Sequence, residues 1–155
     1  MADRKLVIFK LGEENYGLDI EIVKGIEKLL PIVRIPNSVP YIQGIINLRG
    51  SIIPVLSLRK RFSLPEVPDT ESTELLIISV GETQLAVKVD EVDSIYDLAA
   101  ADIFETPAIV RGADTSYMKE VVLMKDKRLI IVLEAGELLS PQEKAVVQQM
   151  LEQNS

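Results

Sequence analysis

The chain has 155 residues, a formal net charge of −7, no cysteine and no histidine. The absence of thiols and imidazoles excludes disulfide frameworks, Cys/His zinc sites and histidine-based catalysis, and the acidic balance argues against binding to a nucleic-acid backbone. No window approaches the ~20 apolar residues that span a bilayer, and the first residues do not resemble a signal peptide, so we expect a cytoplasmic protein without membrane insertion.

The first elements that the pattern predicts are two strands joined by a turn. An apolar run at residues 6–11 meets a Gly-Glu turn at 12–13, and an alternating run follows at 16–20. The same pattern recurs 69 residues later, around a second Gly-Glu turn at 81–82. Two similar β-units are therefore expected to follow each other along the chain.

Residues 41–62, with the sequence YIQGIINLRGSIIPVLSLRKRF, contain two apolar runs joined at Arg49 and Gly50. Glycine at the joint supplies the positive φ that a tight turn needs, so we expect a β-hairpin with an arginine at its tip. From the pattern alone, Arg49 is a solvated turn residue. The basic run that follows, at 59–61, is expected to be a solvated strand end.

A boundary between the two units is expected at residues 63–74, where two prolines and several acidic residues replace the apolar alternation. The first unit then covers about residues 1–62, and the second covers about 75–139 and ends in a degraded copy of the hairpin passage. Units this small are marginal alone, so we expect two small barrels that pack on each other. The groove at their junction is the natural place for a binding site.

A C-terminal helix is predicted over residues 140–153. Ser140 is its N-cap, Pro141 takes the first helical position, and Glu143 completes a capping box. The apolar residues within 146–151 form one stripe, which we expect to pack on the protein's own barrel rather than on a partner.

No pattern in the chain predicts catalysis, a cofactor or a metal site. The densest carboxylate group is Asp90, Glu91 and Asp93, but it has neither EF-hand spacing nor a histidine partner. We expect it to be a solvated acidic edge. The glycines form neither a G-x-G-x-x-G motif nor a P-loop, and we do not expect an enzyme.

Three passages of the sequence carry a resemblance to a known family. They are ENYGLDIEIVKGIE, then IVRIPNSVPYIQGIINLRGSIIPVLSLRKRF, and most specifically residues 44–50 followed by 53–55. Further support comes from 87–92 and 129–133. The chain closely resembles the CheW family, the adaptors of bacterial chemotaxis, and the related regulatory domain of the receptor-coupled histidine kinase. The match covers nearly the whole chain.

The resemblance implies an all-β fold over residues 1–155, with two SH3-like five-stranded β-barrels packed on each other and a C-terminal α-helix. It implies a non-catalytic adaptor that couples the cytoplasmic tip of chemoreceptors, the methyl-accepting chemotaxis proteins, to the regulatory domain of the histidine kinase CheA in membrane receptor arrays. Two other functions stay open. One is coupling in a non-chemotaxis receptor pathway, and the other is a small-barrel module that binds another peptide or ligand.

Carried over by position, the resemblance implies two sets of contact residues. The receptor-facing candidates are Val23, Gly44, Asn47, Arg49, Gly50, Val92 and Ile95, and the kinase-facing candidates are Ala108 and Ile109. The valines and Ile95 would give an apolar wall, although plain core packing explains them equally well from the residues alone. Gly44 would let a receptor helix approach the backbone closely. Arg49 would either contact the receptor or brace the turn by bonding to carbonyl groups.

The chain departs from the family pattern at two places. Glu120 stands where the family often has glycine, and Lys125-Asp126 replaces the Arg-Gly pair in the second copy of the hairpin. These departures weaken any claim that the two copies bind equivalent partners.

Overall fold

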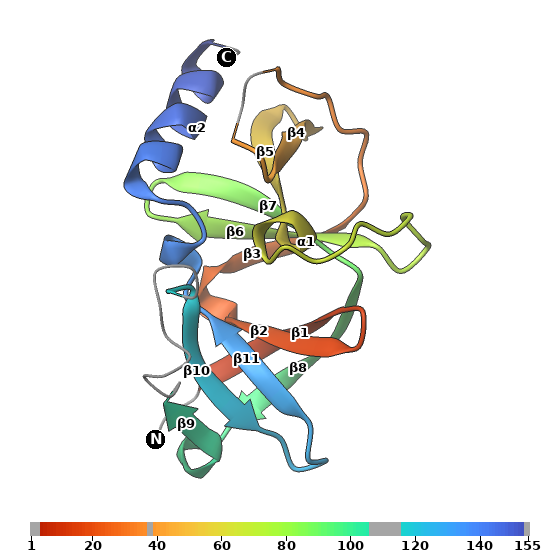
Figure 1. Ribbon diagram of the computed structural model, residues 1–155, viewed down its shortest axis with the longest axis vertical. Helices are drawn as coiled ribbons and strands as arrows, with labels where there is room; N and C mark the ends of the chain where they lie inside the picture. The colour runs from red at the N-terminus through yellow and green to blue at the C-terminus, as the bar shows by residue number, and fades with distance from the viewer. Residues whose placement is uncertain (1–3, 37–38, 106–115, 154–155) are drawn as a thin grey trace.

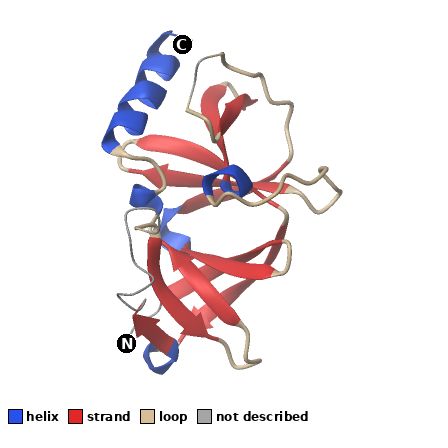
Figure 2. Ribbon diagram, viewed as in Figure 1, coloured by secondary structure: helices blue, strands red, loops and turns tan. Residues whose placement is uncertain are grey.

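The computed structural model describes residues 4–36, 39–105 and 116–153, and it is built mostly of strands (Figures 1 and 2). The strands are β1 (Arg4–Leu11), β2 (Glu14–Asp19), β3 (Val23–Lys28), β4 (Ile42–Leu48), β5 (Ser51–Ser57), β6 (Glu74–Val80), β7 (Thr83–Val89), β8 (Glu91–Leu98), β9 (Ile103–Glu105), β10 (Met118–Leu123) and β11 (Leu129–Leu133). The helices are α1 (Leu58–Arg61), α2 (Pro141–Gln153) and the short 3₁₀ turns η1 (Ile20–Ile22), η2 (Ala100–Asp102) and η5 (Ala135–Glu137).

The strands form two sheets, each with a small apolar core of its own. One sheet has the order β8-β1-β2-β11-β10-β9 and the other has the order β3-β6-β7-β5-β4. A third and larger cluster, the central core, lies between the sheets and takes residues from both. The predicted all-β architecture of two SH3-like units packed on each other is confirmed, with β9 as an additional short strand at the edge of one unit.

The two halves of the chain do not each form one barrel, which corrects the serial units predicted at residues 1–62 and 75–139. β1 and β2 share a sheet with β8–β11, whereas β3–β5 share a sheet with β6 and β7. The chain crosses between the sheets after β2 and again after β7. Each sheet is therefore a hairpin from one half, completed by strands from the other half.

The internal repeat is preserved in the register of the strands. Val23 lies opposite Ile78 in the β3–β6 pair, and Val92 lies opposite Phe9 in the β8–β1 pair; both relations follow the shift of 69 (92 minus 23, 78 minus 9). Each of these two strand pairs also contains a register shift, and the two shifts lie at positions that the repeat aligns with each other. The parallel pairs β5–β7 and β11–β2 correspond in the same way, with a shift of 77 between β5 and β11. The two sheets are thus related by an approximate internal two-fold symmetry.

The C-terminal helix α2 forms as predicted. The Ser140 Oγ accepts a hydrogen bond from the Glu143 N–H (3.1 Å), and the Glu143 Oε1 accepts one from the Ser140 N–H (2.8 Å), which completes the capping box. Val147 is buried in the central core. The helix therefore packs on the protein's own strands. Within the described ranges, no helix has the length and apolarity to cross a bilayer.

The basic run at 59–61 and the acidic group at 90–93, both expected to be solvated, are joined by a partly buried contact. We call this contact the arginine clamp; it is formed by Arg59, Asp90 and Gly12. The Arg59 Nε donates to the Asp90 carboxylate (2.9 Å), its Nη2 also pairs with that carboxylate, and its Nη1 donates to the Pro65 carbonyl (2.6 Å). The same carboxylate accepts a hydrogen bond from the Gly12 N–H (2.7 Å). Because Asp90 stands at the crossing after β7 and Gly12 in the β1–β2 turn, the clamp ties the two sheets together.

The basic residue at the end of α1 is also enclosed. The Arg61 guanidinium carbon lies 5.3 Å from the ring centre of Tyr41 and 4.9 Å from that of Tyr117, and the Nε donates to the Leu138 carbonyl (2.7 Å). Contacts of a cation with aromatic faces stabilise such a position. The expectation of a solvated strand end at 59–61 is therefore wrong for both arginines, because the run forms α1 and both guanidinium groups are held by residues of other elements.

Candidate functional site

The candidate site begins at the tip of the β4–β5 hairpin. Leu48 and Ser51 lie opposite each other, which leaves Arg49 and Gly50 as a two-residue turn with φ values of 50° and 91°. Turns with two positive φ values match the twist of hairpin strands. The Asn47 side chain accepts a hydrogen bond from the Gly50 N–H (2.8 Å) and fixes the turn. The predicted hairpin with an arginine at its tip is confirmed.

Arg49 forms an ion pair across the five-stranded sheet. Its side chain is 73% exposed, and its Nη2 lies 3.3 Å from the Oε2 of Glu27 on β3. β3 and β4 are the outer strands of this sheet, so the pair joins its two edges. An ion pair this exposed contributes about 1 kcal/mol or less, and most of the guanidinium surface stays accessible to a partner.

Gly44 has a structural role that differs from the role that the resemblance implies. A Cβ at this position would lie 2.1 Å from the carbonyl oxygen of Val33, so glycine makes room for the chain's own segment before β4. Val33 and Ile45 exchange two backbone hydrogen bonds of 2.8 and 2.9 Å. The close approach expected for a receptor helix is thus made by Val33, and Gly44 shapes the hairpin from a buried position.

The apolar candidates lie on β3 and β8, which are edge strands of the two different sheets. Together with Ile26 they are the residues that we call the apolar wall. Val23 and Ile26 on β3 share one face, as do Val92 and Ile95 on β8, because the cross-strand partners of all four belong to the central core. The two valines are partly buried, whereas Ile95 is 55% exposed and Ile26 is 41% exposed. Plain core packing therefore does not account for Ile95.

Two residues of this region were missed by the sequence interpretation. Ile26 is the counterpart of Ile95 under the repeat (95 minus 69), so the alignment of the two halves contained the signal. Glu27 had no such signal, because its pairing with Arg49 depends on the curvature of the sheet. Along β3, Ile26 belongs to the apolar wall and Glu27 to the opposite face, so this strand connects the wall with the hairpin tip.

Ala108 and Ile109, the kinase-facing candidates, lie outside the described residues. The neighbouring strands β9–β11 carry a second exposed surface, which we call the apolar sheet face. Its members are Phe104, which is 53% exposed, Leu123 (38%) and Leu129 (61%). Leu123 and Leu129 lie directly opposite each other, and Phe104 lies opposite Val121, two residues from Leu123, so all share one side of the sheet.

The fold and these surfaces define a class of protein. The described residues contain no group of three or more acidic side chains placed to hold a metal ion. The features that stand out are a hairpin tip fixed by the Asn47–Gly50 hydrogen bond, strand edges, and exposed apolar faces. Small β-domains bind other proteins through such features. The molecule is a double-barrel protein of the interaction-module class.

Comparison with known proteins identifies the family. The CheW-like domain matches residues 5–143, and the chain belongs to this family. It is 35% identical over 143 residues to the chemotaxis protein CheW of Treponema pallidum, covering 90% of this chain and 84% of that one. It is 33% identical over 135 residues to the chemotaxis protein CheW of Bacillus subtilis, covering 87% and 86%. The crystal structure of the scaffolding protein TtCheW from Thermoanaerobacter tengcongensis superimposes with a TM-score of 0.82 at 32% identity, covering 92% of each chain.

Proposed function

We propose that the chain is a non-catalytic adaptor of chemotaxis, which couples the cytoplasmic tip of chemoreceptors to the regulatory domain of the histidine kinase CheA. The observation that carries the proposal is the hairpin tip, where the family's most specific motif presents an exposed Arg49 on a fixed turn. The names of the relatives, chemotaxis and scaffolding proteins, support it. Such an adaptor acts in the cytoplasm and is recruited to membrane receptor arrays by its partners.

The receptor-facing surface in this proposal is the hairpin tip together with the apolar wall. An amphipathic helix binds by laying its apolar stripe against such a wall. Arg49 then supplies a charged contact at the end of the helix, and Asn47 and Gly50 fix the position of that arginine. Gly44 acts indirectly, because it sets the course of the hairpin rather than touching the helix.

The kinase-facing surface is the apolar sheet face together with Ala108 and Ile109. Phe104 stands four residues before Ala108, and it shares its side of the sheet with Leu123 and Leu129. A flat apolar face at a sheet edge suits docking against another barrel, whereas the wall suits a helix. The two partners can then bind at the same time.

Isothermal titration calorimetry with a receptor-tip fragment and with the isolated kinase regulatory domain tests the proposal. We expect dissociation constants in the micromolar range for both, as for transient signalling contacts. Arg49→Ala should weaken receptor binding and leave kinase binding unchanged, and Leu129→Lys should do the reverse. Arg34→Ala, which removes an exposed arginine outside both surfaces, is the matched control. Absence of both interactions at tens of micromolar would refute the proposal.

A further inference from the structure

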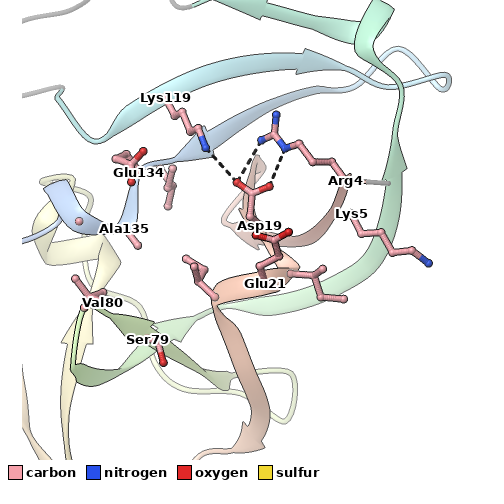
Figure 3. A pocket seen from close by; sticks show the side chains of 14 residues that line it. Arg4, Lys5, Asp19, Glu21, Ser79, Val80, Lys119, Glu134 and Ala135 are labelled. Carbon is pink, nitrogen blue, oxygen red and sulfur yellow. Dashed lines mark hydrogen bonds and ion pairs between the residues drawn. The ribbon is translucent and has the colours of Figure 1, made fainter. Parts of the chain in front are cut away.

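A cavity of about 570 Å³ lies at the seam between the two sheets (Figure 3), and none of its lining residues belongs to the hairpin tip, the apolar wall or the apolar sheet face. Its walls come from both halves of the chain. One wall of the cavity contains Glu21 of η1 and Gly81 of the β6–β7 turn. Another wall contains Glu134 and Gly136, which follow β11.

The internal symmetry makes this cavity the counterpart of the arginine clamp. The shift of 69 relates the two turns and the two crossings, and the shift of 77 relates the ends of β5 and β11. Applied to the clamp, these shifts pair Gly81 with Gly12, Glu21 with Asp90, and Gly136 with Arg59. The turn glycine and the carboxylate are thus kept, whereas glycine replaces the arginine. The cavity therefore has the turn glycine and the carboxylate of an arginine clamp, but the chain places no arginine at the third position.

The cations in the wall of the cavity are already paired. Arg4 bonds to both carboxylate oxygens of Asp19 (2.9 and 3.2 Å) and also to Glu120, and the Lys119 Nζ lies 3.4 Å from Asp19. Figure 3 shows Asp19 between Arg4 and Lys119, with Lys5 pointing away. Arg4 and Lys119 balance Asp19 and Glu120, and the Lys5 Nζ lies 3.4 Å from Asp97, so the charge that remains in the cavity is that of its other carboxylates.

Those remaining carboxylates are Glu21 and Glu134, and both belong to exposed residues. Ile20, Ile22 and Val80 complete the walls with apolar surface. A cavity with carboxylates and apolar sides suits a long cationic side chain, which buries its aliphatic stem and pairs its head. Guanidinium fits better than ammonium, because its planar fork reaches two acceptors at once, as Arg59 does with Asp90 and the Pro65 carbonyl.

We propose that this cavity receives an arginine side chain from a partner protein, which completes the clamp from outside the chain. The site lies beyond the receptor-facing and kinase-facing surfaces proposed above, and it does not depend on them. An arginine bound there ties together the crossing after β2, the β6–β7 turn and the segment after β11, as Arg59 does in the other half.

Titration of the isotope-labelled full chain with N-acetyl-arginine amide, followed by amide chemical shifts, tests the proposal. We expect saturable shifts of the Gly81 and Gly136 amides in the millimolar range. The neutral isostere N-acetyl-citrulline amide and the variant Glu21→Gln should each weaken binding about tenfold or more, as loss of a charged hydrogen bond predicts. Glu71→Gln, outside the cavity, should bind like the parent chain. Absence of shifts up to 50 mM probe, or equal binding of the citrulline probe, would overturn the proposal.

A second variant fills the cavity from within. A Cβ at Gly136 would have its nearest neighbour, the Glu134 Oε1, at 3.9 Å, so Gly136→Arg is sterically open. It should abolish probe binding and raise the melting temperature, whereas Gly136→Met should not raise it. Arg111 of the chain itself lies outside the described residues, and binding seen only in Arg111→Gln would show that this residue is the occupant and overturn the proposal. If Gly136→Arg fails to fold, the Glu21→Gln titration decides alone.

Discussion

Asp90→Ala removes the carboxylate on which the arginine clamp is built. It leaves the Arg59 side chain, which is only 15% exposed, with the Pro65 carbonyl alone, and it leaves the Gly12 N–H without its acceptor. A hydrogen bond to a charged group contributes about 1.5–3 kcal/mol, and the lower end applies here because Asp90 is itself 27% exposed. Loss of both contacts should lower the free energy of unfolding by about 3 kcal/mol. For a chain of this length, that corresponds to a melting temperature lower by about 6–12 °C.

The effect should depend on pH in a defined direction. The hydrogen bonds from Arg59, and then from the Gly12 N–H, hold the pKa of Asp90 below its ordinary value. A carboxyl group whose pKa is lowered by folding stabilises the protein fully above its ordinary pKa of about 4, and this contribution is lost as the pH falls through the lowered value. The difference in stability between the parent chain and Asp90→Ala should therefore shrink in acid.

Urea denaturation followed by circular dichroism at pH 7 and in acid measures both effects. Asp97→Ala is the matched control, because Asp97 is 86% exposed and its partner Lys5 is 49% exposed, so its loss should change the free energy of unfolding by less than about 0.5 kcal/mol. A cost below about 1 kcal/mol for Asp90→Ala at pH 7, or a cost that stays constant into acid, would show that the clamp does not hold the sheets together.

Three further changes test local features. Gly44→Ala should lower the free energy of unfolding by at least about 2 kcal/mol, because the new Cβ meets the Val33 carbonyl. At Gly50 a new Cβ has no atom within 4 Å, so Gly50→Ala should lower it by only about 1 kcal/mol, through the positive φ. Urea denaturation of both variants compares the two costs. Among the described residues, the buried hydroxyl of Tyr96 has no hydrogen-bond partner. Tyr96→Phe should therefore leave the free energy of unfolding unchanged or raise it by up to about 1 kcal/mol. A clear decrease would show that the hydroxyl does have a partner. Ser140→Ala should cost about 1 kcal/mol in thermal unfolding through loss of the capping box, and no change would mean that α2 is held by packing alone.

The features that the sequence predicts well depend on neighbours along the chain. The β4–β5 hairpin needs only two apolar runs and a glycine that accepts positive φ, and the start of α2 needs only Ser140, Pro141 and Glu143. Each signal is complete within a few residues. The repeat at a shift of 69 is equally visible, because it compares the chain with itself.

The local sequence pattern does not predict the route of the chain between the two sheets. Alternation tells which face of a strand is buried, but it does not tell which hairpin the strand joins. β3 pairs with β6 as readily as it would with β2, and the pattern of Val23 and Ile26 is the same in either case. The arginine clamp was missed for the same reason, since Arg59 and Asp90 are 31 residues apart and meet only through the crossing.

The candidate site shows the same division. The place of Arg49 at the hairpin tip was predicted because the turn is local, whereas its part in receptor binding stays a prediction. The role of Gly44 was not predicted, because the group that approaches it is Val33, on a segment with no regular pattern. Ile26 was within reach, because the repeat already paired it with Ile95.

The crossing of the chain also determines the order in which the sheets are completed during synthesis. The five-stranded sheet has all its strands once β7 has been made, whereas β1 and β2 must wait for β8 and β11. Pairing between strands so far apart slows folding and leaves apolar edges exposed in the meantime. On the ribosome, the β1–β2 hairpin is therefore made before the five-stranded sheet but is completed into its own sheet after it.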